Sequence, residues 1–217
     1  MIDDLQAGAA QLVCMRCQYG KILVVVHPQW KSSLPWKVFG QIFRAFSRVT
    51  SKNLWRVVLF ANPSLREYPV SPQEPGPEHI NGGYAYPGEP RSVVIYRLEE
   101  SARVMVHELL HAAGTDTMSN DESLRETLTE SYAELFLIAI QSNGSIRKAN
   151  TLWKIQAQWI VDQEARLTKE FGVTTSLQYA YRYTVARRPQ LESWGLRFPS
   201  TSQQSTSLRF TAPPLTL

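Results

Sequence analysis

The chain has 217 residues, of which 43% are hydrophobic and 11% aromatic, so it can bury a sizeable core and is not wholly disordered. Its longest apolar runs, residues 22–26 and 135–140, are far shorter than the ~20 residues of a membrane span, and no secretory signal is visible. The net charge is +4, but residues 99–134 carry nine acidic and two basic side chains between two basic flanks. This is not the basic stripe of a nucleic-acid-binding protein. Two cysteines, Cys14 and Cys17, are too few for a disulfide framework. We therefore expect an intracellular, cytoplasmic protein that binds neither membranes nor nucleic acid.

Three short strands and one helix are predicted in the first hundred residues. Runs of apolar and β-branched residues at 21–27, 54–60 and 91–97 indicate buried strands. Apolar residues at helical intervals indicate a helix over 35–51. Residues 62–90 hold seven of the 13 prolines and four of the 11 glycines, so we expect an ordered loop there, without regular structure and draped over a site.

The second half of the chain is predicted to be helical. Helices are expected over about 99–113 and 146–171, each followed by a glycine that can cap its end. Another is expected over about 121–142, where an Asn-Asp pair can cap the start. A fourth helix is expected to start near residue 175.

The order of these elements predicts a single α+β domain over residues 1–188. A small N-terminal mixed sheet would be followed by a helical C-terminal half. From residue 189 onward the chain is rich in Ser, Thr, Gln and Pro, so residues 189–217 are predicted to be a tail.

Residues 107–111 read H-E-L-L-H and fit the motif H-E-x-x-H within a predicted helix. With 3.6 residues per turn, His107 and His111 lie on one face a single turn apart, so both imidazoles can reach one ion. Glu108 is rotated by about 100° from His107, where it can touch a metal-bound water but is not a natural ligand. The spacing predicts that two neutral histidines hold Zn²⁺ and that Glu108 takes a proton from its water. Two histidines can share a helix by chance, but the chain has only four histidines and two of them meet this spacing.

A catalytic zinc site needs a third protein ligand and an open fourth position. A histidine six residues after His111 is excluded, because position 117 is a threonine. Asp116 follows the helix-ending Gly114 too closely to be placed at the metal. Glu130 follows His111 with eighteen residues between them, which is enough for a second helix to return antiparallel to the first.

Four glutamates recur every fourth residue along this second helix: Glu122, Glu126, Glu130 and Glu134. Such a row is often a solvated face, and the first two are interpreted as favourable charges near the start of a helix. Residues 135–140 are apolar all round, however, so the C-terminal half of the helix is expected to be buried. A buried carboxylate is costly unless it is paired or metal-bound, so we favour Glu130 as the third ligand.

These residues resemble the active site of the gluzincin zinc metallopeptidases. The sequence H-E-L-L-H at 107–111 is followed after eighteen residues by T-E-S-Y-A, which is similar to the aminopeptidase-N-like pattern except for threonine and serine in place of asparagine and glycine. The resemblance implies a zincin-like fold, Zn²⁺ held by His107, His111 and Glu130, and a peptide or protein substrate. It covers only about residues 107–134. The exopeptidase motif G-A-M-E-N is absent upstream, so exopeptidase action is not implied.

The resemblance also implies roles for residues around these ligands. In gluzincins of the thermolysin type, an acidic residue four positions after the ligand glutamate holds a zinc histidine by its far nitrogen, and Glu134 occupies that position. In zincins the strand before the motif helix is an edge strand along which the peptide lies. In this chain, residues 92–96 would form that strand. The residues that flank the motif also loosely resemble small metallopeptidase-like proteins of large DNA viruses.

A peptidase of this kind needs a hydrogen-bond donor for the oxyanion, opposite Glu108. Gluzincins supply a tyrosine or histidine from downstream, and here the resemblance implies Tyr179, Tyr181 or Tyr183. The glycine-rich loop offers Tyr84 and Tyr86 as alternatives.

The sequence thus predicts a zinc-dependent metallopeptidase that hydrolyses peptide bonds. Two other classes of function fit the same residues, namely a zincin-like module that binds peptides without turnover and a structural or interaction domain with a non-catalytic zinc site. The intact Glu108 favours the enzyme. The sequence predicts neither the identity of the substrate nor the oligomeric state.

Overall fold

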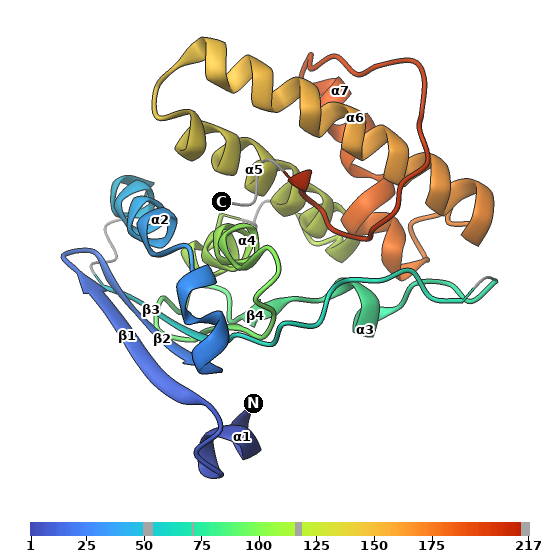
Figure 1. Cartoon of the computed structure of the whole chain (residues 1–217). Coiled ribbons are helices and arrows are strands. Elements are labelled where there is room, and N and C mark those ends of the chain that lie inside the picture. The colour runs from blue at the N-terminus through green and yellow to red at the C-terminus, as the bar shows by residue number, and fades with distance from the viewer. Residues whose placement is uncertain (50–53, 71, 116–118, 214–217) are drawn as a thin grey trace. The chain divides into compact units, whose positions relative to one another are not determined.

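The computed structural model describes residues 1–49, 54–70, 72–115 and 119–213 (Figure 1). The chain divides into two compact units, and each is described by itself. The first comprises Met1–Leu65 and Gly82–Thr115, and the second comprises Arg66–Asn81 with the described residues after 118. An N-terminal mixed sheet is followed by a helical C-terminal half, so the predicted α+β class is confirmed.

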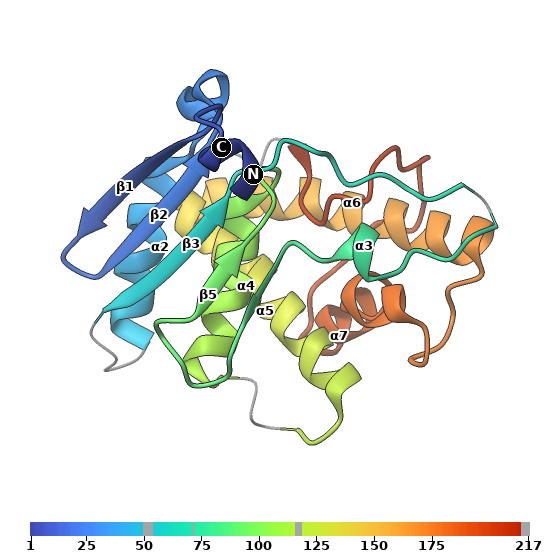
Figure 2. The ribbon, with the colours of Figure 1, turned by 90° about the horizontal axis from the view of Figure 1, so that it is seen from below.

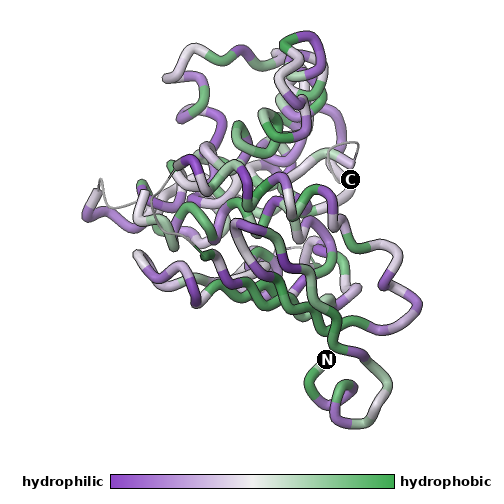
Figure 3. The backbone as a smooth tube through the Cα atoms, turned by 90° about the vertical axis from the view of Figure 1, so that its left-hand side faces the viewer, coloured by the Kyte–Doolittle hydropathy of each residue, from purple (hydrophilic) through white to green (hydrophobic). Residues whose placement is uncertain are grey.

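A five-stranded sheet with the strand order β1-β2-β3-β5-β4 forms the framework of the first unit. Its strands are β1 (Gln11–Cys17), β2 (Gly20–Val26), β3 (Trp55–Phe60), β4 (Gly83–Ala85) and β5 (Val93–Ile95). β2, β3 and β5 run parallel to one another, and β1 and β4 are antiparallel edge strands. The three predicted strands correspond to β2, β3 and β5, which are among the most hydrophobic stretches of the chain (Figure 3).

The edge of the sheet differs from the prediction. Residues 92–96 were expected there, but β5 pairs with β3 on one side and with β4 on the other. The edge strand is β4, which lies within the Pro- and Gly-rich stretch 62–90 together with the short helix α3 (Pro77–Ile80). The expectation of a stretch without regular structure is therefore wrong at these places. A strand of three residues is too short to show an alternating pattern, and only its register with β5 identifies it.

Helices α2 (Trp36–Val49) and α4 (Ser101–Ala113) lie on one face of the sheet (Figures 1 and 2). α2 is the helix predicted over 35–51, and it buries Phe39, Ile42, Phe43 and Phe46. The ring of Phe43 lies so close to Gly20 of β2 that an added Cβ would be 2.4 Å from it, so this position requires glycine. Two short helices, α1 (Ile2–Gln6) and η1 (Pro28–Ser33), complete the first unit.

The second unit is built on α5 (Glu122–Ser142) and α6 (Ile146–Phe171), which pack against each other. Both match the predicted helices, because their ends are encoded locally. The side chains of Asp121 and Ser145 accept hydrogen bonds from the first turns, and Asn143 and Gly172 end the helices in the left-handed conformation. Among the described residues, no helix combines the length and the apolar character needed to cross a bilayer.

The C-terminal segment is more ordered than predicted. The fourth helix begins later than residue 175, as a π-helical turn η2 (Tyr181–Val185), and continues as α7 (Arg187–Ser193) past Pro189. A proline is tolerated there because backbone N–H groups in the first turn of a helix have no intrahelical partner. Beyond α7 the described chain is irregular, yet Leu208 and Phe210 are buried against α6 residues and carbonyl groups of this segment accept hydrogen bonds from Gln156 and Trp159.

Candidate metal centre

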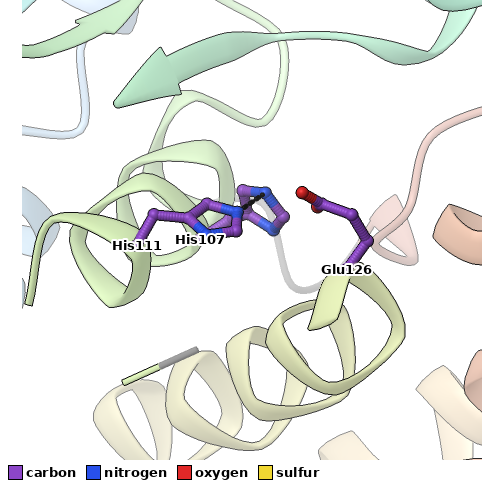
Figure 4. A group of neighbouring side chains, drawn as sticks. All are labelled: His107, His111 and Glu126. Carbon is purple, nitrogen blue, oxygen red and sulfur yellow. Dashed lines mark hydrogen bonds between the residues drawn. The ribbon is translucent and has the colours of Figure 1, made fainter. Parts of the chain in front are cut away.

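Helix α4 places the two motif histidines side by side. Its residues 101–112 are all buried, and Gly114 ends the helix with φ 73°, as predicted. The Nε2 atoms of His107 and His111 are 3.0 Å apart, and the two rings are nearly perpendicular (Figure 4). Two nitrogens bound to one tetrahedral zinc at 2.0–2.1 Å would be roughly 3.3 Å apart. The two imidazoles are thus arranged as a pair of ligands to a single ion would be.

Glu108 lies on the same helix but faces the edge strand. Its side chain is 5% exposed, and a Cβ added to Gly83 of β4 would lie 3.0 Å from Glu108 Oε1. The same added atom would be 2.7 Å from the carbonyl oxygen of Val94. Gly83 therefore leaves the space that the Glu108 carboxylate occupies under β4. No sequence pattern singled out Gly83, because its importance depends on the packing of β4 against α4.

Burial increases along the row of glutamates on α5. Glu122 is exposed and forms an ion pair with Arg182 at 2.7 Å, Glu126 is partly buried, and Glu130 and Glu134 are buried at 2% and 0% exposure. This gradient agrees with the prediction that Glu130 and Glu134 are buried, but the helix is buried on one side only, because Ala139 is exposed and Leu135, Phe136 and Ile140 are partly buried.

One glutamate of this row belongs to a possible metal site with the two histidines. His107, His111 and Glu126 each offer one ligand atom, and these atoms all lie within 4.8 Å of one another (Figure 4). Such a group of two histidines and one glutamate could hold a metal ion. From the sequence, Glu126 was interpreted as a charge near the helix start, and Glu130 was favoured as the ligand. All four glutamates share one face at a spacing of four residues, so the sequence alone does not tell them apart.

The assignment of Glu130 to the metal stays a prediction. Glu130 lies one turn beyond Glu126, and its negative charge is one of the influences on the nearby Tyr183 phenol. Asp116, the other acidic residue close to the motif, and Thr117, which occupies the position of a third histidine in another zinc pattern, lie outside the described residues.

Glu134 forms a buried ion pair that was not predicted. Its Oε2 atom accepts a hydrogen bond from Nη1 of Arg187 at 3.1 Å, and both side chains are fully buried. Arg187 also donates to Gln163 Oε1 and to the carbonyl oxygen of Phe210. Arg187 thus joins α5, α6 and the C-terminal segment. The role of Glu134 in orienting a zinc histidine stays a prediction.

The three candidate tyrosines of the second unit differ in their surroundings. The Tyr179 hydroxyl donates to Asn81 Oδ1 at 2.5 Å and lies 3.4 Å from the hydroxyl of Tyr183. Burial raises the pKa of the Tyr183 phenol, and the negative charge of Glu126 raises it further. All three tyrosines pack against the apolar cluster that includes Leu208. Of the three tyrosines, Tyr183 is thus the one whose phenol has a pKa raised by burial and by the negative charges on α5.

Tyr84 and Tyr86, the alternatives in the first unit, are more than half exposed. Their rings meet edge to face at 6.2 Å. They lie in or next to β4, and an exposed hydroxyl at this edge remains accessible to a ligand.

Comparisons with known proteins identified no relative of the chain. No protein-family model, curated protein or solved structure matches the chain. A function for the chain is consequently inferred from the residues of α4, α5 and β4 themselves.

Proposed function

We propose that the chain is a zinc-dependent metallopeptidase of the zincin type that hydrolyses peptide bonds. The observation that carries this proposal is the convergence of His107 Nε2, His111 Nε2 and a carboxylate of α5, with Glu108 on the same helix as the histidines. Imidazole nitrogens and a carboxylate oxygen are donors that Zn²⁺ accepts, and three protein ligands leave open the position that a catalytic site requires.

The donor set supports zinc over the other common divalent ions. Mg²⁺ and Ca²⁺ prefer oxygen ligands, whereas imidazole suits zinc and the later transition metals. Bound at these residues, Zn²⁺ would polarise the scissile carbonyl group and lower the pKa of a water molecule.

The protein's own groups would move the proton and stabilise the developing charge. Glu108 would accept a proton from the attacking water and deliver it to the leaving amine. Tyr183 would donate a hydrogen bond to the oxyanion, because burial disfavours the charged phenolate and raises the pKa of the phenol. The peptide would pair with the edge strand β4, which has a free side for main-chain hydrogen bonds within the first unit.

Metal analysis of protein purified without a histidine tag tests this proposal. We expect about one zinc per chain, together with hydrolysis of peptides from an unbiased library that stops on chelation and returns with added zinc. Bound zinc without hydrolysis would point instead to a peptide-binding module or a structural zinc site. Protein that binds no zinc would contradict the proposal.

Chelation should lower the thermal stability of the protein. A ligand that binds only the folded state at a hundredfold excess over its Kd adds about 2.7 kcal/mol to the free energy of unfolding. For a chain of this length, that corresponds to a decrease in Tm of about 5–10 °C when the metal is removed. Differential scanning calorimetry with and without chelator measures the change. The His107→Ala variant serves as the control, because its Tm should no longer respond to chelator or zinc.

Replacing Gly83 by alanine should reduce turnover while leaving the metal in place. The added Cβ would meet the Glu108 carboxylate and the Val94 carbonyl oxygen, so either β4 or the side chain must move. Misplacing a catalytic group by about 1 Å can cost on the order of a hundredfold in rate, and we expect a decrease in kcat of roughly 10- to 100-fold. Gly40→Ala on α2 is the matched control, because nothing lies within 4 Å of its added Cβ. An unchanged kcat in folded Gly83→Ala protein would show that Gly83 does not position Glu108.

A further inference from the structure

A basic pocket lies in the first unit, on the face of the sheet opposite to α2 and α4. Its volume is about 360 Å³, and it is lined by Arg16, Lys21, Arg56 and Arg91 together with apolar residues that include Leu23 and Val58. Side chains alternate along a strand, and Val57 and Leu59 are buried toward the helices, so Arg56 and Val58 point to the other face.

The strand register brings three of these cations into one row. Arg16 of β1 is opposite Lys21 of β2, and Lys21 is opposite Arg56 of β3. Arg91 stands next to the row, since the backbone N–H of Arg56 donates to the carbonyl oxygen of the preceding residue, Pro90. The four basic residues come from four separate parts of the chain and line a single pocket.

This row has no compensating negative charge within the part of the chain that is described. None of the residues that line the pocket is acidic, and none of the four cations takes part in an ion pair with a described residue. Like charges directly opposite each other on neighbouring strands are destabilising. A multiply charged anion bound among them would remove this repulsion.

We propose that this pocket binds a phosphate-type dianion, carried as the phosphomonoester group of a small molecule. Arginine offers several N–H donors in a planar fork that matches phosphate oxygens, and lysine adds a point charge. The volume falls within the range of small-molecule sites, and Leu23 and Val58 offer an apolar surface for the body of the ligand. The row of cations spans only three strands and lines a single pocket with Arg91, which favours a compact anion over a nucleic-acid strand. The site is independent of the proposed metal centre.

Isothermal titration of the zinc-loaded full chain with inorganic phosphate and with phenyl phosphate tests the proposal, using sodium chloride at matched ionic strength as the reference. We expect both anions to bind, phenyl phosphate more tightly because of its apolar ring. Arg56 is chosen for substitution because it is the last member of the row and adjoins Arg91. The Arg56→Gln variant should bind both anions about 10- to 100-fold more weakly, as expected for the loss of a charge-assisted hydrogen bond. Arg44→Gln on the exposed side of α2 is the control and should bind as the wild type does.

The Arg56→Gln variant also distinguishes binding in this pocket from binding at the metal centre. Phosphate that binds to zinc would persist in Arg56→Gln, so equal binding by the variant and the wild type would overturn the proposal, as would no binding of either anion. Without phosphate, the Tm of Arg56→Gln should not be lower than the Tm of the wild type, because the substitution removes a repulsive charge. A lower Tm would overturn the inferred repulsion within the row. An oligonucleotide or an anionic lipid vesicle that binds more tightly than phenyl phosphate, and that depends on Arg56, would overturn the assignment to a small molecule.

Discussion

The Glu108→Gln variant is expected to retain its metal and its fold but to lose peptide hydrolysis. Glutamine has nearly the shape of glutamate, so it fits the space that Gly83 leaves under β4. Its carboxamide cannot accept a proton from water at neutral pH. General bases typically contribute 10²–10⁴-fold to the rate, and we expect kcat to fall by about this factor. Glu108 is offset from the histidine pair on α4, so metal affinity should be little affected.

The measurement combines zinc content, Tm and steady-state kinetics on the best library peptide. Glu122→Gln is the control, because it removes an exposed carboxylate at the start of α5 and should keep its activity. Loss of zinc from Glu108→Gln would identify Glu108 as a ligand and contradict the mechanism. Unchanged turnover with zinc in place would remove Glu108 from the reaction.

Removing either histidine should abolish metal binding, and the glutamates of α5 should differ in their effect. His107→Ala and His111→Ala each delete one of two imidazoles whose Nε2 atoms are 3.0 Å apart, so we expect zinc affinity to fall by several orders of magnitude and activity to be lost. Glu126→Gln should weaken zinc binding strongly, because Glu126 supplies the oxygen that lies within 4.8 Å of both histidine nitrogens.

The Glu130→Gln variant distinguishes between two candidates for the third metal ligand, namely Glu126, which the geometry favours, and Glu130, which the sequence spacing favours. If Glu126 is the third ligand, Glu130→Gln should retain zinc and lose stability in the metal-free protein, because it alters a buried side chain. If zinc binding is lost in Glu130→Gln and kept in Glu126→Gln, the eighteen-residue spacing of the gluzincin pattern is the better guide. Should both variants keep full zinc affinity, neither Glu126 nor Glu130 is the third ligand and the proposed centre is wrong. Competition with a zinc-sensitive dye measures these affinities.

The helix that carries the two motif histidines could be predicted from the sequence because its information is local. Two histidines four residues apart face the same side of any α-helix, whatever surrounds it. Glycine after α4, a capping aspartate before α5 and a glycine after α6 likewise act on the adjacent backbone, and all three helices occur where they were expected. The strands β2, β3 and β5 were predicted for a similar reason, since each contains consecutive apolar residues that include β-branched ones, whereas β4 reads Gly-Tyr-Ala.

The C-terminal segment shows where local patterns fail. A polar composition suggested a tail after residue 188, but Leu208 and Phe210 are buried, and its carbonyl groups receive hydrogen bonds from α6. Arg187 is buried beside Glu134, although arginine is usually an exposed residue. These contacts join positions about 50 residues apart, and a composition window does not contain their partners.

The two histidines, Glu108 beside them, and the helices and main strands that carry them could be predicted because each is defined by neighbours within about one or two turns or a single strand. Three features required the folded structure: β4 forms the sheet edge over Glu108, Glu126 lies within 4.8 Å of the histidines, and four basic residues line one pocket. Each of these depends on strand register or on the packing of distant segments. A shift of one residue in a strand, or of one turn in a helix, would bring different side chains together without changing any local pattern.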